Sequence, residues 1–479
     1  MKLRRANRHG LIAGATGTGK TITLQVLAEG FSDAGVPVFL ADVKGDLTGM
    51  AQAAEPDARL LERAGRIGFD DYRPRGYPTV FWDVFGEKGH PLRATVAEMG
   101  PLLLARMLEL NEVQEGVLNV VFRVADEEGL ALLDLKDLQA MLAETAKRTS
   151  EISARYGNVA PASVGAIQRR LLVLENQGAD RFFGEPALQL SDLIGCDHAG
   201  RGRISILAAD RLMRAPRLYA SMLLWLLSQL FEELPEVGDP EKPILAFFFD
   251  EAHLLFDGAP RALVEKVELV ARLIRSKGVG VYFVTQSPSD VPETILGQLG
   301  NRIQHALRAY TPRDQRALRA AADGFRSNPA FDTARAISEL GVGEAVVSML
   351  DDRGAPGVVQ RTLIRPPQSR MGPADPDALA AARAASPLLG LYERAVDSES
   401  AHEILAAKAA AAAIGAAADD PDHARGRRYS PTVQPAPRLP ARGRETAAEA
   451  AMKSFARSVA SQAGRSLMRG LLGGLFKGR

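Results

Sequence analysis

The chain has 479 residues, of which 46% are hydrophobic and 24% charged, which is the profile of a globular protein and excludes fibrous and wholly disordered classes. A single cysteine, Cys196, excludes a disulfide framework within the chain and a zinc site built from thiolates, so we expect a reducing, cytoplasmic setting. The longest apolar runs are far shorter than the roughly 20 residues that span a bilayer, and we expect no signal peptide.

The formal net charge of +1 hides an uneven distribution of charge along the chain. Residues 421–479 carry 12 Lys and Arg against 3 Asp and Glu, whereas the rest of the chain carries 47 against 55. An acidic body is therefore followed by a basic tail. Such tails often bind nucleic acid or an anionic membrane, although a solvated tail without a partner has the same composition.

The first 50 residues predict one βαβ unit with a right-handed crossover. Residues 10–13 are a short apolar strand, residues 21–31 carry apolar side chains at helical spacing, and residues 36–40 are a second buried strand. The eight residues between the first strand and the helix are Gly14, Ala15, Thr16, Gly17, Thr18, Gly19, Lys20 and Thr21.

These eight residues match the full pattern of a phosphate-binding loop, in the strand–loop–helix context that the pattern requires. Glycines let the backbone fold tightly so that its N–H groups point at phosphate oxygens, and the helix adds its positive N-terminal end. Lys20 is expected to reach the β- and γ-phosphates, and the Thr21 hydroxyl is expected to ligate magnesium. The sequence therefore predicts ATP and Mg²⁺ as cofactors.

The middle of the chain predicts a helical insertion followed by the return of the sheet. Residues 92–176 carry apolar stripes at helical spacing, after which strands are expected at 204–207, 244–249 and 279–284. Helices are expected at 216–234 and 263–276, and a further strand pair near 303–307 and 344–349. Strands that alternate with helices indicate the α/β class with a mostly parallel, doubly wound sheet.

Polar side chains follow two of these strands. Asp250 and Glu251 come directly after six apolar residues, at the carboxyl end of a buried strand, where a ligand crevice forms. Asp250 is the expected magnesium ligand, and Glu251 is the expected general base for the attacking water. Gln286 ends the next strand, where it could orient that water.

The C-terminal part loses this pattern after residue 365. The domain prediction is a first ATPase segment at 1–90, a helical insertion at 91–200, a second ATPase segment at 201–365, a low-complexity linker at 366–450 and a basic amphipathic tail at 451–479. The linker includes an alanine-dominated stretch at 406–418.

Several motifs together resemble one known group of proteins. They are residues 9–14 (HGLIAG), 41–47 (ADVKGDL), 248–253 (FFDEAH) and 285–288 (TQSP), extended by 301–303 (NRI) and 311–314 (TPRD). Over roughly residues 7–365 the chain is similar to the bacterial HerA helicase-like branch of the HerA–FtsK superfamily of P-loop ATPases. The resemblance implies a RecA-like fold, a homo-oligomeric ring that is usually a hexamer, and DNA as the substrate to be pumped or unwound.

The resemblance also implies roles for individual residues. Gln286 would be the polar sensor of the γ-phosphate. An arginine would be inserted from the neighbouring subunit; Arg275 is the best match, Arg272 and Arg302 are alternatives, and each could equally be a solvated charge. One of the three charged residues after the second strand would assist the metal or a subunit contact; they are Asp42, Lys44 and Asp46.

One feature departs from the family's pattern. HerA-type motors carry a small barrel ahead of the ATPase, whereas nine residues precede the first predicted strand here. Two functions therefore stay open: an oligomeric ATPase that translocates or unwinds DNA, and an ATPase that acts on a protein or membrane partner through the basic tail.

Overall fold

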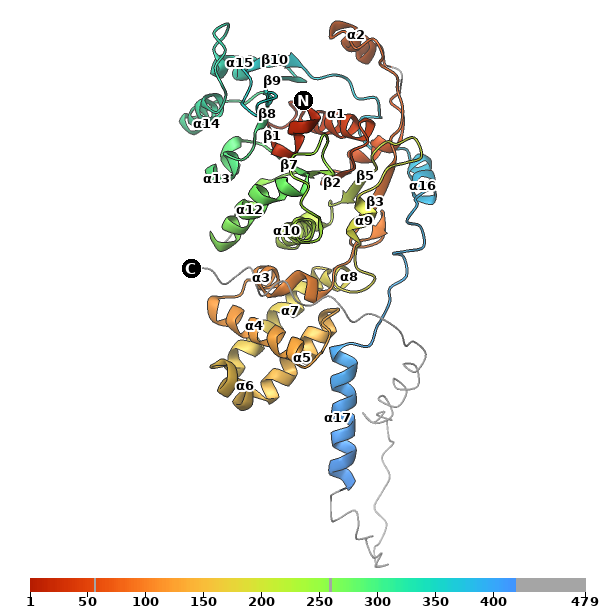
Figure 1. The fold of residues 1–479 in the computed structure, drawn as a ribbon, viewed down its shortest axis with the longest axis vertical. Coiled ribbons are helices and arrows are strands. Elements are labelled where there is room, and N and C mark those ends of the chain that lie inside the picture. Colours follow the sequence, from red (N-terminus) through yellow and green to blue (C-terminus); the bar gives the residue numbers. More distant parts are fainter. Residues whose placement is uncertain (56, 258–260, 419–479) are drawn as a thin grey trace, which may run out of the picture. The chain divides into compact units, whose positions relative to one another are not determined.

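The computed structural model describes residues 1–55, 57–257 and 261–418, and the chain divides into two compact units, Met1–Asp397 and Ser398–Arg479. In the first unit the strands form one sheet in the order β10-β9-β8-β1-β7-β6-β2-β5-β3-β4 (Figure 1). Neighbouring strands run parallel except in the pairs β8–β9 and β9–β10. The strands are β1 (Gly10–Ala13), β2 (Val38–Asp42), β3 (Thr79–Asp83), β4 (His90–Pro91), β5 (Ile204–Ala208), β6 (Leu245–Phe249), β7 (Val279–Thr285), β8 (Asn301–Gln304), β9 (Glu344–Ser348) and β10 (Gln360–Leu363).

The predicted mostly parallel, doubly wound sheet is confirmed, because each strand expected from an apolar run is present within a few residues of its expected bounds. The strand pair expected near residues 303 and 344 is also present, as β8 and β9. Strands β3, β4 and β10 were not predicted. β10 is a largely exposed edge strand of polar residues, so no apolar run marks it.

Helices cover both faces of the sheet (Figure 1). On one face α1 (Lys20–Asp33) packs Leu24 and Phe31 against inward side chains such as Leu40 and Phe248. The opposite face is covered by α10 (Pro216–Glu233) and α12 (Arg261–Leu273). Burying each large apolar side chain in this way contributes roughly 1.5–3 kcal/mol, so the strand centres have little freedom to shift.

The predicted helical insertion is confirmed between β4 and β5. Its helices are α3 (Val96–Met107), α4 (Glu112–Glu127), α5 (Leu135–Lys147), α6 (Thr149–Tyr156) and α7 (Pro161–Asn176), followed by the short α8 (Ala179–Phe182) and α9 (Leu190–Leu193). Capping boxes at Thr95, Asn111 and Asp134 fix the starts of α3, α4 and α5. Helix α3 packs on α10, which is therefore buried between the sheet and the insertion.

Shorter elements complete the two units. They are the 3₁₀ helices η1 (Leu3–Arg8), η2 (Leu47–Ala51), η3 (Leu212–Arg214), η4 (Ile274–Lys277) and η5 (Pro288–Asp290), and the α-helices α2 (Ala58–Arg66), α11 (His253–Phe256), α13 (Glu293–Leu296), α14 (Pro312–Asp323), α15 (Thr333–Glu339), α16 (Pro376–Ala384) and α17 (Ala401–Ala418). No helix of the described residues is both long and apolar enough to cross a membrane.

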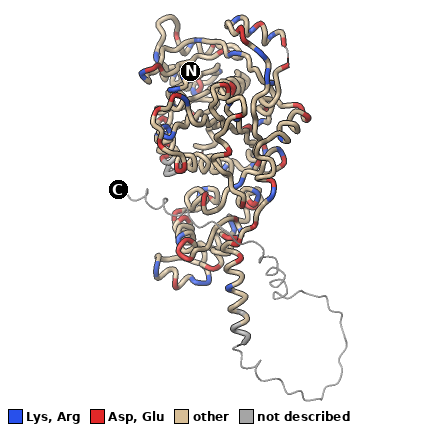
Figure 2. The backbone as a smooth tube through the Cα atoms, turned by 45° about the vertical axis from the view of Figure 1, so that its right-hand side comes forward, with Lys and Arg blue, Asp and Glu red and all other residues tan. Residues whose placement is uncertain are grey.

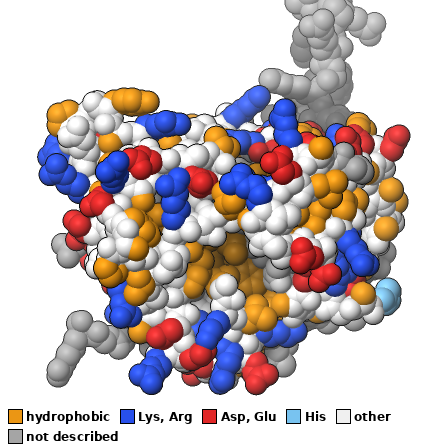
Figure 3. Space-filling view, turned by 90° about the horizontal axis from the view of Figure 1, so that it is seen from above, with side chains coloured by type: hydrophobic (Ala, Val, Ile, Leu, Met, Phe, Trp, Pro, Cys, Tyr) orange, Lys and Arg blue, Asp and Glu red, His pale blue; other side chains and the backbone are white. Residues whose placement is uncertain are grey.

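Charged residues of both signs are interspersed along the described chain (Figure 2). One face of the molecule likewise carries both signs, with hydrophobic side chains exposed around a central hollow (Figure 3). The basic tail predicted at 451–479 and the linker residues 419–450 lie outside the described residues.

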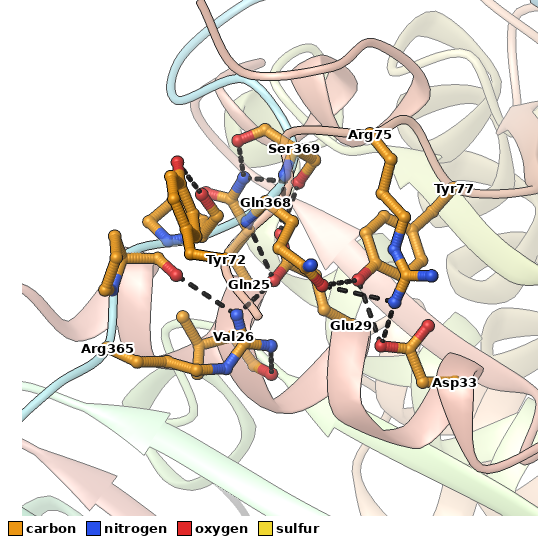
Figure 4. Close-up of polar contacts among 12 residues, drawn as sticks. Gln25, Val26, Glu29, Asp33, Tyr72, Arg75, Tyr77, Arg365, Gln368 and Ser369 are labelled. Carbon is orange, nitrogen blue, oxygen red and sulfur yellow. Dashed lines mark hydrogen bonds and ion pairs between the residues drawn. The ribbon is translucent and has the colours of Figure 1, made fainter. Parts of the chain in front are cut away.

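A buried carboxylate ties the segment after β10 to the helix that follows the phosphate loop (Figure 4). Glu29 of α1 is fully buried. Its Oε1 accepts hydrogen bonds from the Ser369 N–H (2.9 Å) and hydroxyl (2.7 Å). Its Oε2 accepts from the Gln368 N–H (3.1 Å) and pairs with the Arg365 guanidinium (2.9 Å). Residues 365–369, called here the strap, are thereby fixed across α1.

The strap also contacts residues that precede β3. The Gln368 Oε1 accepts hydrogen bonds from the Tyr77 hydroxyl (2.8 Å) and the Arg75 guanidinium (3.2 Å). Both of those donors also reach Asp33 at the end of α1, at 3.2 and 2.6 Å. Residues 366–397 therefore pack in the same unit as the strands, although the sequence analysis begins its low-complexity linker at residue 366.

Replacing Glu29 with alanine should destabilise the fold strongly. The change leaves a largely buried Arg365 without its carboxylate and the Gln368 and Ser369 N–H groups without acceptors, which typically costs about 3–5 kcal/mol. Urea unfolding would measure the loss. Glu55→Ala is the control, since the Glu55 carboxylate is exposed and its ion pair with Arg370 is worth about 1 kcal/mol or less. Equal losses in the two variants would contradict the structural role of Glu29.

Candidate phosphate-binding and catalytic site

The phosphate loop is fixed at its start by the two strands that flank β1. The Gly14 N–H donates to the Thr285 carbonyl at the end of β7 (3.3 Å), and the Ala15 N–H donates to the Ala306 carbonyl just after β8 (2.9 Å). β1 pairs in parallel with both strands. The loop therefore emerges at the carboxyl edge of the sheet, as the sequence predicts.

The second half of the loop is held by the residue that precedes β9. The Gly343 N–H donates to the Thr18 carbonyl (3.0 Å), and the Gly343 carbonyl accepts from the Arg63 guanidinium of α2. Gly19 has a φ of 110°, and a Cβ there would lie 3.3 Å from the Gly343 backbone. The conformation favours glycine at this position, and the nearby Gly343 backbone leaves little room for a Cβ.

A buried histidine lies beneath the loop. The His305 Nε2 is 2.8 Å from the Thr23 hydroxyl of α1, and a Cβ on Gly14 would come within 2.5 Å of the His305 Cβ. Burial lowers the pKa of His305 to about 4, so its imidazole is neutral at pH 7. His305 thus joins the end of β8 to α1 without adding a charge beneath the phosphate site.

Lys20 occupies the first position of α1 with its ammonium folded back over the loop. Its Nζ donates to the Gly14 carbonyl (2.6 Å) and the Ala15 carbonyl (3.2 Å). Burial lowers the pKa of Lys20, and the nearby carboxylate of Glu251 opposes that shift. Thr21 follows in the same helical turn and is half-buried. Lys20 therefore contacts the loop directly and is acted on by the charges of Glu251 and Asp250.

Asp250 and Glu251 follow β6, which is separated from β1 by β7. Asp250 accepts a hydrogen bond from the Glu251 N–H at its Oδ1 (3.0 Å), and its carbonyl accepts from the Tyr219 hydroxyl of α10 (3.0 Å). Burial, and next the charge of Glu251, raise the pKa of Asp250 to about 7. A cation bound beside this carboxyl group would lower its pKa again and favour the ionised form.

Glu251 has an unusual backbone conformation and a buried side-chain oxygen without a hydrogen-bond donor among the described residues, and both features are typical of a functional residue. Its φ of 48° lies in the left-handed region, which is strained for a residue with a side chain. Its Oε2 is buried and accepts no hydrogen bond from the described residues, and the Nδ1 of His253 lies 3.5 Å from this oxygen. A buried acceptor without a donor fits a carboxylate whose partner is a water molecule.

The predicted metal ligands have suitable chemistry. The Thr21 hydroxyl and the Asp250 carboxylate are hard oxygen donors of the kind that Mg²⁺ prefers. The charges of Asp42 and Glu251 both act on Asp250, and a divalent cation would offset this clustering of carboxylates. The residues present therefore fit magnesium.

The three charged residues after β2 have different surroundings. Asp42 is buried, and its carboxylate accepts hydrogen bonds from the Gly45 N–H (2.7 Å) and the Leu47 N–H (2.9 Å). Asp42 therefore shapes the following loop. Lys44 acts electrostatically on both Lys20 and Asp250, so it lies near the phosphate site, and Asp46 acts on Asp42.

Gln286 directly follows β7 with its side chain exposed. It lines a pocket together with His253, Phe256, Asp257 and Asp290. Asp290 was not predicted as a site residue; its carboxylate accepts from the Thr285 hydroxyl (2.7 Å) and its charge acts on Lys20. Its sequence signal is the capping box formed with Ser287.

The three candidate arginines have different surroundings. Arg275 lies in η4, before β7 begins and therefore at the edge of the sheet opposite its own phosphate loop. It pairs with Asp239 at 3.0 Å, and Arg5 and Arg8 pair with the same carboxylate. Arg272 is exposed at the end of α12.

Arg302 is fully engaged within its own chain. Its guanidinium donates to the carbonyls of Leu296, Leu299 and Gly324, at 2.8 to 3.1 Å. It therefore closes the ends of α13 and α14. Arg272, which is exposed, and Arg275, whose guanidinium pairs with the partly exposed Asp239, remain as candidates.

His305→Gln should change how stability depends on pH. Between pH 4 and 6.5 the folded protein binds fewer protons at His305 than the unfolded chain, so the parent loses stability as the pH falls through this window. Relative to His305→Gln, the parent should lose about 2 kcal/mol of unfolding free energy between pH 7.5 and 5. Urea titrations at several pH values would measure this difference, and a constant difference would contradict a neutral buried imidazole.

Comparison with known proteins places this site in a family. Among curated relatives, the DNA double-strand break repair helicase HerA of Saccharolobus solfataricus is 22% identical over 349 residues, covering 71% of this chain and 61% of that protein. The protein of the same name from Sulfolobus acidocaldarius is 25% identical over 357 residues, covering 72% of this chain and 63% of that protein. The chain thus spans about three fifths of the length of these relatives.

A solved structure with the same fold is the plasmid coupling protein TrwB in complex with the non-hydrolysable ATP analogue ADPNP. It is 15% identical, with a TM-score of 0.51 over 77% of this chain and 88% of that chain. The sequence also matches the family described as Helicase HerA-like C-terminal over residues 1–479. Because this match covers the whole chain, the protein belongs to the helicase HerA-like C-terminal family of P-loop ATPases.

Proposed function

We propose that this chain hydrolyses ATP as a subunit of an oligomeric motor that acts on DNA. The observation that carries the proposal is Glu251, a strained residue at the carboxyl edge of the sheet whose buried Oε2 accepts no hydrogen bond from the described residues. A protein that only held nucleotide would gain nothing from such a carboxylate. The charge of Glu251 acts on Lys20, so the acid and the phosphate-binding lysine serve one site, which favours phosphoryl transfer to water.

The chain's own residues would divide the work of hydrolysis. The loop N–H groups and the N-terminal end of α1 bind the phosphates, and Lys20 exchanges the Gly14 and Ala15 carbonyls for phosphate oxygens. Thr21 and Asp250 would hold magnesium, which neutralises charge that develops on the phosphates. Glu251 orients and deprotonates the attacking water, and Gln286 reports the γ-phosphate to the segment that follows β7.

The oligomeric part of the proposal rests on Arg275. Its position at the opposite edge of the sheet prevents it from reaching its own phosphate loop, but leaves it available to a neighbouring subunit. If Arg275 moves to a neighbouring subunit, Asp239 still has Arg5 and Arg8 as ion-pair partners. The loss of Arg275 therefore does not leave the Asp239 carboxylate without a cationic partner. The choice of DNA as the substrate rests on the relatives, which are named as DNA double-strand break repair helicases.

The first experiment is ATP hydrolysis by the purified chain with and without DNA. Hydrolysis should rise with DNA and disappear in Lys20→Ala and Glu251→Gln. Lys20→Ala should also lose nucleotide binding, whereas Glu251→Gln should keep it, because only the base is removed. Hydrolysis that ignores DNA would favour a protein or membrane partner. A parent that binds but never hydrolyses ATP would contradict the catalytic assignment.

Arg275→Ala should keep nucleotide binding and lose hydrolysis on the order of 10³-fold, the typical worth of an arginine supplied between subunits. Arg272→Ala, one helical turn earlier, is the control and should stay near the parent rate. A mixture of inactive Arg275→Ala and Lys20→Ala subunits should regain activity, since each supplies what the other lacks. Failure of the mixture to recover, with intact oligomers by light scattering, would exclude action in trans.

A further inference from the structure

Helix α14 and the loop before it present an arginine-rich surface that the catalytic site does not use. Figure 1 shows α14 beside α15, at the end of the sheet formed by β8, β9 and β10. We call this the α14 surface, and its exposed residues are Arg308, Tyr310, Arg313, Arg316 and Arg319. Tyr310 is 83% exposed, an unusual position for so large an aromatic ring.

The packing of α14 explains why its arginines face outward. Leu318 and Ala322 pack into a small core with Ile337 of α15 and Val346 of β9. Arg313, Arg316 and Arg319 recur every third residue, so they follow the remaining exposed side of the helix.

The α14 surface keeps its positive charge. From residue 308 to 319 there are four arginines and one carboxylate, Asp314. That carboxylate caps the helix by accepting a hydrogen bond from the Thr311 N–H (3.0 Å). Within the described residues none of the four arginines has a carboxylate at ion-pair distance, whereas Arg335 on the neighbouring α15 pairs with Glu339 at 2.8 Å.

Two connections join the α14 surface to the catalytic site. The loop that carries Arg308 and Tyr310 begins at Ala306, whose carbonyl holds the Ala15 N–H of the phosphate loop. Helix α14 also packs on η5, which starts two residues after Gln286. A ligand on this surface would therefore act on backbone that is attached to both the loop and the γ-phosphate sensor.

The geometry points to a binding surface for a single DNA strand on α14. The four arginines contact consecutive phosphates, and Tyr310 stacks on an unpaired base. Phosphate contact follows from a row of guanidiniums that lack carboxylate partners within the described residues, although the Arg316 Nε donates to the Pro312 carbonyl (3.3 Å). Base stacking follows from the exposed ring of Tyr310 beside them. This inference rests on the proposed function for its biological meaning, but DNA binding can be measured without any hydrolysis.

The test is fluorescence anisotropy of a labelled 30-nucleotide oligo(dT) and of a blunt 30-base-pair duplex, across a series of salt concentrations. The triple variant Arg313→Gln, Arg316→Gln, Arg319→Gln should reduce the slope of log K against log[salt] by about 2, at roughly 0.7 per lost phosphate contact. Tyr310→Ala should weaken oligo(dT) binding by roughly 5- to 100-fold and leave the duplex nearly unchanged.

The matched control is Arg155→Gln, Arg169→Gln, Arg181→Gln, which removes the same charge from exposed positions of the helical insertion. All variants should keep the parent's basal ATP hydrolysis. If the parent hydrolyses ATP and binds DNA, but the α14 variants bind DNA like the control, the α14 assignment is wrong and the proposed function stands. If the α14 variants instead change the oligomer's mass, the surface is a subunit contact and the inference is likewise overturned.

Discussion

The site depends on three backbone hydrogen bonds that fix the phosphate loop to the carboxyl edge of the sheet. They come from the ends of β7 and β8 and from the residue before β9, so the loop cannot move without those strands. Two of these strands also lead into other residues of the candidate site: Gln286 follows β7, and His305 follows β8. The parallel arrangement of β6, β7, β1 and β8 therefore turns separate sequence motifs into one site.

The helical insertion and the strap connect this site to the rest of the first unit. Arg106 at the end of α3 donates to the Leu255 carbonyl (3.2 Å), four residues after Glu251, so the insertion contacts the segment that carries the proposed general base. On the other face of the sheet, Glu29 anchors the strap to α1, the helix that begins with Lys20. A movement of α1 on nucleotide binding would therefore also move the strap, which follows β10.

The sequence predicted the parts of the molecule that local patterns encode. Apolar strands, the glycine loop and the acids after β6 have short, periodic signatures, and they lie where those signatures place them. Contacts between distant segments have no such signature. Glu29 reads as one charge on an amphipathic helix, and its partners lie some 340 residues later. Arg302 reads as a candidate for the neighbouring subunit, yet three carbonyls of its own chain occupy its guanidinium.

The role of Glu251 is tested most directly by a single turnover of pre-bound ATP, started by adding Mg²⁺ and followed by rapid quenching. Parent and Glu251→Gln should bind ATP equally, while the chemical step in the variant slows by roughly 10²- to 10⁴-fold, the typical contribution of a general base. That result would show that the carboxylate of Glu251, directly after β6, takes part in the hydrolysis step. Equal rates in the two proteins would show that Glu251 does not activate the attacking water.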